Sequence, residues 1–118
     1  MADPTLFHNP RCSKSRGARD LLDDAGVTYE VVEYLKAPPS RADLERLVAR
    51  LEDDPAALVR TGEPGFKALG IDKGELDATT VVDVLADHPD LMERPVLVVG
   101  ERAVIGRPPE RVLALLEG

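Results

Sequence analysis

The sequence holds one cysteine and no tryptophan, and aromatic residues make up only 3% of its 118 residues. A lone cysteine forms no disulfide within the chain, so we expect a reducing, cytoplasmic compartment. Because aromatic residues are scarce, the core is expected to be aliphatic. One domain of this length buries roughly two-thirds of the unfolded chain's surface, so neither a disulfide nor a structural metal is needed for folding.

Positive charge is also in short supply. Lysine and arginine total 15 against 22 acidic residues, which gives a formal net charge of −7. Nucleic-acid binding depends on a basic surface that neutralises phosphates, so this balance argues against a nucleic-acid partner. Long apolar runs are missing as well, and no basic stretch followed by an apolar one opens the sequence. We therefore expect neither a signal peptide nor a membrane segment.

The apolar pattern predicts alternating strands and helices. Strands are expected at 5–8, 29–34, 95–99 and 103–105. A first helix is expected to follow the turn at Asn9-Pro10, with its apolar positions at 18–25 and a stop near Gly26. Further helices are expected at 40–51, 78–88 and from Pro108 on, with short helices and loops over 53–74. The strand at 95–99 is apolar throughout, which is typical of a central, buried strand. This order predicts one α/β domain (1–118) with a thioredoxin-like fold: a four-stranded mixed sheet flanked by helices, with a helical insertion at about 40–90.

Cys12 follows the first expected strand and opens the first expected helix. At a helix N-terminus, unpaired N–H groups and the helix dipole favour the thiolate over the thiol. Arg11, Lys14 and Arg16 add positive charge nearby. We therefore interpret Cys12 as a reactive thiol rather than a small core residue. His8 either stabilises the thiolate as an imidazolium or caps the turn, and the sequence leaves both roles open.

Three arginines beside loop residues form a second candidate cluster: Arg60, Arg94 and Arg107. Guanidinium groups bind oxyanions through paired hydrogen bonds, and the free N–H groups of a helix start also bind anions. In the expected topology Arg94 precedes the central strand and Arg107 follows its hairpin partner. Both are therefore expected near the sheet edge that carries Cys12, although spacing alone does not show that they converge. The bond before Pro95 is a candidate for a cis peptide.

Several segments together resemble the arsenate reductase family related to the Spx regulators. They are His-Asn-Pro-Arg-Cys-Ser-Lys-Ser-Arg at 8–16, segments 34–35, 38–41, 58–60 and 88–89, Arg-Pro at 94–95 and Gly-Arg-Pro at 106–108. The resemblance covers nearly the whole chain. It implies a thioredoxin-like fold and the two-electron reduction of arsenate to arsenite.

The same resemblance implies a role for each candidate residue. Cys12 would attack arsenate and form a thioester-like arsenic adduct. Arg60, Arg94 and Arg107 would bind the oxyanion and stabilise its charge. His8 and Ser15 would help to activate the thiolate. Glutathione would be the co-substrate and glutaredoxin the partner that resolves the mixed disulfide, and the chain itself has no second cysteine for that step.

Two other functions stay open. The segment at 12–15 has the Cys-x-x-Ser form of monothiol glutaredoxins, which act on glutathione mixed disulfides or hold iron–sulfur clusters. The acidic surface also suits a protein-binding adaptor similar to the Spx regulators. Ser15 stands where that branch carries a second cysteine, which weakens the adaptor hypothesis. No metal site is expected, because His8 and Cys12 are two ligands, His88 is remote, and zinc usually takes four.

Overall fold

The computed structural model describes residues 4–117. The strands are β1 (Thr5–His8), β2 (Glu30–Glu33), β3 (Val96–Val99) and β4 (Arg102–Ile105). The α-helices are α1 (Ser13–Asp24), α2 (Arg41–Arg50), α3 (Pro64–Lys67), α4 (Ala78–Asp87) and α5 (Arg111–Glu117). Short 3₁₀ helices lie at Pro55–Leu58, Lys73–Glu75 and Pro89–Leu91. None of the helices described in this range has the length and apolar character needed to cross a membrane.

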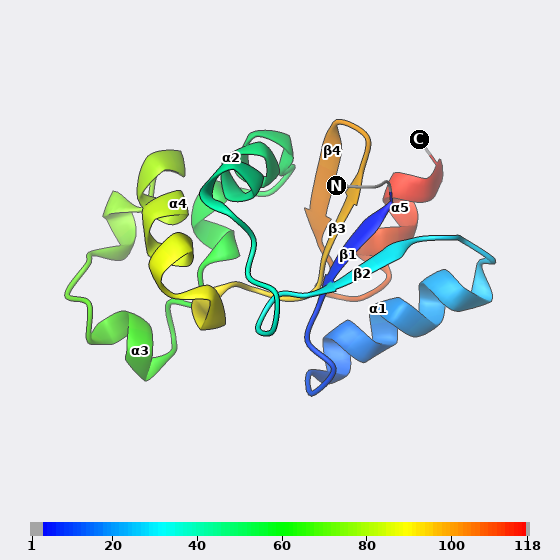
Figure 1. The fold of residues 1–118 in the computed structure, drawn as a ribbon, viewed down its shortest axis with the longest axis horizontal. Helices are drawn as coiled ribbons and strands as arrows, with labels where there is room; N and C mark the ends of the chain where they lie inside the picture. Colours follow the sequence, from blue (N-terminus) through cyan, green and yellow to red (C-terminus); the bar gives the residue numbers. More distant parts are fainter. Residues whose placement is uncertain (1–3, 118) are drawn as a thin grey trace.

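The four strands form one mixed sheet in the order β2-β1-β3-β4 (Figure 1). β1 runs parallel to β2 and antiparallel to β3, and β3 and β4 form an antiparallel hairpin. β3 therefore lies inside the sheet, as its apolar sequence predicts. The α/β class, the four-stranded mixed sheet and the thioredoxin-like arrangement expected from the sequence are confirmed.

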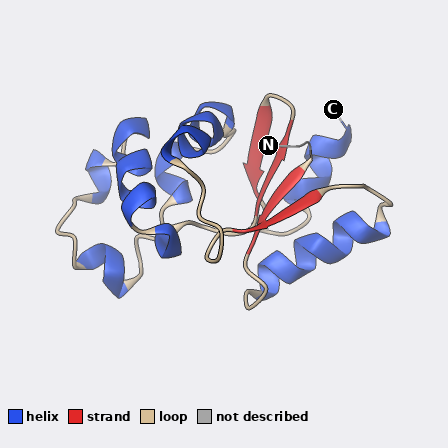
Figure 2. Cartoon of the chain, viewed as in Figure 1, coloured by secondary structure: helices blue, strands red, loops and turns tan. Residues whose placement is uncertain are grey.

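Helices cover both faces of the sheet (Figure 2). Neighbouring residues of a strand fall into two different core clusters, one on each face. Leu6, Leu97 and Val104 pack against the apolar sides of α1 and α5. On the other face, Phe7 and Val96 belong to a core shared with residues of α2 and α4. The helical segment between β2 and β3 thus packs directly onto the sheet, and it brings its own loops to the sheet edge where β1 ends.

Local signals place several element ends correctly. Ser40 caps α2: its hydroxyl accepts a hydrogen bond from the Asp43 backbone N–H at 3.1 Å, and the Asp43 carboxylate accepts one from the Ser40 N–H at 3.3 Å. This is the predicted capping box. The last helix starts later than expected, at Arg111 instead of Pro108. The bonds before Pro95 and Pro108 are both cis, so the proposed cis peptide at Pro95 is present and the second was not foreseen.

Candidate active site

Cys12 is the N-cap residue of α1, directly after the turn that leaves β1. Its backbone N–H donates to the Asn9 carbonyl at 3.0 Å, and its carbonyl accepts from the Arg16 N–H at 3.0 Å. N-cap side chains usually carry an oxygen that accepts from the helix backbone, and at Cys12 a sulfur takes this position beside the backbone N–H groups of Lys14 and Ser15. The two backbone hydrogen bonds of Cys12 therefore fix the position of the sulfur at the start of α1.

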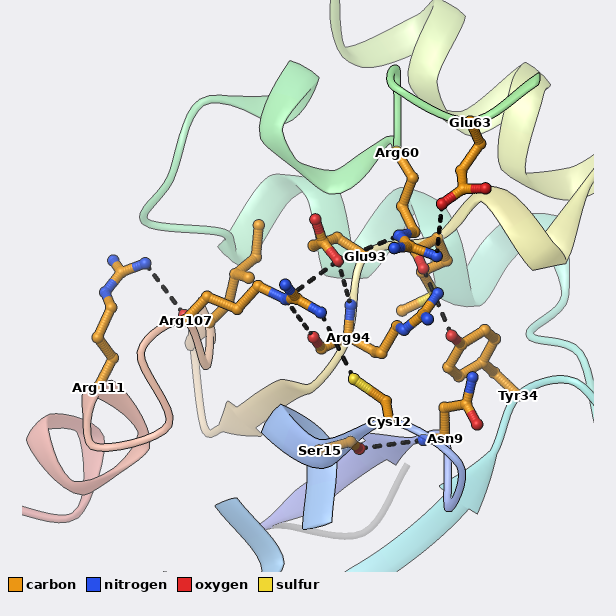
Figure 3. Close-up of polar contacts among 12 residues, drawn as sticks. Asn9, Cys12, Ser15, Tyr34, Arg60, Glu63, Glu93, Arg94, Arg107 and Arg111 are labelled. Atoms are coloured by element: carbon orange, nitrogen blue, oxygen red, sulfur yellow. Dashed lines mark hydrogen bonds and ion pairs between the residues drawn. The ribbon is translucent and has the colours of Figure 1, made fainter. Parts of the chain in front are cut away.

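Two arginines from the C-terminal part of the chain act on this sulfur. Arg107 Nη2 donates to Cys12 Sγ at 3.4 Å (Figure 3), and the Arg94 guanidinium lowers the pKa of the thiol. Burial by itself raises the pKa of the Cys12 thiol. The Arg94 guanidinium and the backbone N–H groups of Ser15 and Lys14 outweigh burial, so the pKa lies below its ordinary value.

The direction of this pKa shift agrees with the sequence-based expectation, but its source differs. Arg11, Lys14 and Arg16, the neighbours expected to supply positive charge, all have exposed side chains. Arg16 Nη1 instead donates to the Pro10 carbonyl at 3.0 Å. The guanidinium groups that stabilise the thiolate come from distant segments, which sequence proximity does not reveal.

Ser15 and His8 fasten the turn beneath the sulfur. The Ser15 hydroxyl accepts a hydrogen bond from the Asn9 N–H at 3.0 Å and lies 2.6 Å from His8 Nδ1. Since that oxygen already accepts a hydrogen bond, the arrangement suits donation from the Ser15 hydroxyl to Nδ1 of a neutral imidazole. Burial and then Arg19 lower the pKa of His8, although Glu33 raises it. A neutral, buried His8 favours the turn-fastening role over the imidazolium role.

The three predicted arginines gather around a carboxylate, Glu93, that the sequence analysis did not single out (Figure 3). Glu93 Oε1 lies 3.2 Å from Arg107 Nε and 3.5 Å from Arg60 Nε. It also accepts a hydrogen bond from the Arg94 backbone N–H at 3.2 Å. Arg107 Nε donates in addition to the Arg94 carbonyl at 2.8 Å. Arg107 thus contacts the sulfur, Arg94 acts on its pKa, and Arg60 joins the cluster through Glu93 and pairs with Glu63 at 3.1 Å.

Tyr34 lies against the other side of the cluster and was also missed as a site residue. Its ring is fully buried, its hydroxyl donates to the Met92 carbonyl at 3.4 Å, and burial raises its pKa. The charges of Arg94 and Cys12 both act on this phenol. Its sequence signal was hidden, because an aromatic residue at the end of a strand is usually a core residue.

One donor in this site has no acceptor. Among the described residues, Arg94 Nε is the buried side-chain nitrogen or oxygen without a hydrogen-bond partner. Buried polar atoms in proteins are nearly always paired, so this unpaired guanidinium N–H is an exception within the described residues. Within the same residues, no cluster of three His, Cys, Asp or Glu side chains is arranged to hold a metal ion.

Alkylation of Cys12 tests the lowered pKa directly. At a pH below the pKa of Cys12 in the folded protein, the thiol reacts slowly, and at a pH above it the rate of alkylation reaches a plateau. The lowered pKa therefore moves the curve of alkylation rate against pH to lower pH. We expect half-maximal iodoacetamide reaction below the value of about 8.5 that is usual for cysteine. The same protein in denaturant is the control, and Arg94→Ala should move the curve up. Coinciding curves for the folded and unfolded chains would contradict the lowered pKa.

Known proteins match the chain over nearly its full length. The model of the ArsC family matches residues 7–115. A protein named arsenate reductase from Neisseria meningitidis is 40% identical over 117 residues, which cover 98% of this chain and 100% of that protein. The uncharacterized protein YfgD from Escherichia coli is 42% identical over 112 residues, 94% of each chain. A solved structure named arsenate reductase from Vibrio cholerae superimposes with a TM-score of 0.86 at 38% identity, covering 94% of this chain and 95% of the other.

Proposed function

The chain belongs to the ArsC family, and on that premise we propose that it reduces arsenate to arsenite, with Cys12 as the nucleophile and glutathione and glutaredoxin as the external reductants. The observation that carries the proposal is that the Cys12 sulfur and the guanidinium groups lie in one cluster. Arg107 Nη2 lies 3.4 Å from Cys12 Sγ, and the unpaired Arg94 Nε lies in the same cluster. Relatives named arsenate reductase support arsenate as the substrate.

The first step is attack by sulfur on arsenic(V). The Cys12 thiolate forms an S–As bond, and one arsenate oxygen leaves as water after it is protonated. Arsenic stays at oxidation state five in this adduct. The lowered pKa of Cys12 supports this step, because the thiolate and not the thiol is the nucleophile.

The arginines hold the oxyanion during that step. Arg94 and Arg107 bind the arsenate oxygens and stabilise the negative charge that develops on them, and the backbone N–H groups at the start of α1 add to this. Arg60 supports the cluster through its ion pair with Glu93. His8 and Ser15 keep the turn that carries the sulfur in one conformation.

The electrons come from two thiols. Reduction of arsenic(V) to arsenic(III) takes two electrons, and formation of one disulfide from two thiols supplies them. The chain holds a single cysteine, so the second sulfur must come from another molecule. The glutathione sulfur attacks Cys12 Sγ, so that an S–S bond forms while the S–As bond breaks. The electron pair of the broken bond stays on arsenic, which leaves as arsenite, and a Cys12–glutathione disulfide remains. A glutaredoxin thiol then takes over the glutathione and returns Cys12 to the reduced form.

Arsenite formation by the purified protein tests the proposal. We expect turnover with glutathione and glutaredoxin together, and markedly slower turnover with either alone or with thioredoxin. Absence of arsenite with every thiol donor would refute arsenate reduction. Turnover of a glutathionylated peptide without arsenate, at a rate that Arg94→Ala leaves unchanged, would instead support a monothiol glutaredoxin-like enzyme.

A further inference from the structure

The arginine cluster is less positive than its three guanidinium groups suggest. Three negative groups face them: the Cys12 thiolate, Glu63 and Glu93. The Glu93 side chain is only 20% exposed, so solvent screens its charge little. A surplus of positive charge therefore does not explain which anions this site accepts.

Glu93 lies beside the place where an oxyanion would contact the sulfur. A single guanidinium connects the two groups, since Arg107 bonds to Glu93 Oε1 through Nε at 3.2 Å and to Cys12 Sγ through Nη2 at 3.4 Å. Figure 3 shows both contacts on that one side chain. An anion that touches both the sulfur and Arg107 has the carboxylate as its neighbour.

A carboxylate in this position has acceptor capacity left. The contacts from Arg107, Arg60 and the Arg94 N–H all fall on Oε1 of Glu93, and Oε2 makes none of them. An ionised carboxylate offers about four acceptor positions and no donor. It binds an oxygen that carries a proton and repels one that does not.

We infer that Glu93 is a specificity-determining residue that admits tetrahedral oxyanions carrying at least one hydroxyl group and excludes fully deprotonated ones. The hydroxyl donates a hydrogen bond to Glu93 while the remaining oxygens accept from Arg94 and Arg107. Arsenate and phosphate keep a hydroxyl near neutral pH, whereas sulfate has none. Selection by an unfavourable contact with the wrong ligand is a general route to specificity. The inference rests on the proposed function in that it takes the arginine cluster as the oxyanion site.

Protection of Cys12 from iodoacetamide by phosphate, arsenate and sulfate tests this role near neutral pH. For the unaltered protein we expect phosphate and arsenate to protect at concentrations about tenfold or more below those of sulfate. Glu93→Gln keeps the shape but removes the charge and adds an N–H donor, so sulfate should protect about tenfold better and the preference should largely disappear. Glu93→Asp keeps the charge and should still exclude sulfate. Glu52→Gln is the matched control, because Glu52 pairs with Arg102 outside the site.

The results separate this inference from the proposed function. Equal protection by sulfate and phosphate in the unaltered protein, or no gain for sulfate in Glu93→Gln, overturns the role of Glu93 even when arsenate is reduced. If Glu93→Gln removes the preference for phosphate over sulfate but the unaltered protein forms no arsenite, the role of Glu93 is upheld and arsenate reduction is refuted. Circular dichroism and thermal unfolding of each variant show whether it folds. If Glu93→Gln does not fold, the comparison of sulfate with phosphate in the unaltered protein still decides, because equal protection by the two anions overturns the role of Glu93.

Discussion

Replacing Cys12 with serine is expected to lower the rate of arsenate reduction by at least about a thousandfold, the scale on which loss of a catalytic nucleophile is felt. A serine hydroxyl stays protonated at neutral pH, so the hydrogen bond from Arg107 and the N–H groups of α1 would face a neutral oxygen instead of a thiolate. The measurement is steady-state arsenite formation with glutathione and glutaredoxin at saturating concentrations.

The control for this variant is Ser13→Ala. Ser13 is exposed and begins the same helix, so its replacement tests the helix start without touching the sulfur. Ser13→Ala should retain near-normal turnover. Arsenite formation by Cys12→Ser at a rate close to that of the unaltered protein would show that sulfur does not attack arsenic.

Arg107→Ala is expected to reduce kcat/KM for arsenate by roughly 100-fold to 1000-fold, the usual cost of removing one donor that stabilises developing charge. The same change should raise the pKa of Cys12, because the thiolate loses its hydrogen bond from Nη2. The kcat/KM of Arg107→Lys should lie between those of the unaltered protein and Arg107→Ala, since lysine keeps the charge but cannot contact Cys12 and Glu93 through one planar group. Arsenite kinetics and the pH profile of alkylation measure the two effects.

Arg102→Ala is the matched control for Arg107→Ala. Arg102 is the first residue of β4, and its exposed side chain pairs with Glu52, which follows α2. This ion pair does not include Cys12 or the arginine cluster. Exposed ion pairs contribute little to stability, so this variant should fold and turn over normally. Were Arg107→Ala to leave both kcat/KM and the alkylation profile unchanged, the arginine would have no part in holding the oxyanion.

Local features of the fold could be predicted from the sequence, because each depends on residues that are close to one another in the chain. The end of β1 and the start of α1 follow from an apolar run, a turn containing Pro10 and helical spacing after Cys12. The capping box at Ser40 needs only Asp43 three residues later. The start of α5 was misplaced for the opposite reason. Proline is common at the first position of a helix, but Pro108 lies with Arg107 in the bend between β4 and α5.

The sequence by itself determined the α/β class and the position of Cys12 at a helix start, because these depend on local propensity and residue chemistry, and it offered the three arginines as candidates. Only the tertiary structure decided that Arg107 touches the sulfur, that Arg94 lowers its pKa and that Arg60 reaches the cluster through Glu93. The β1–β3 pairing brings the end of one strand beside the start of another that is distant in the chain. A glutamate next to an arginine has no spacing signal of its own, and its role as a shared ion-pair partner exists only where separate segments meet.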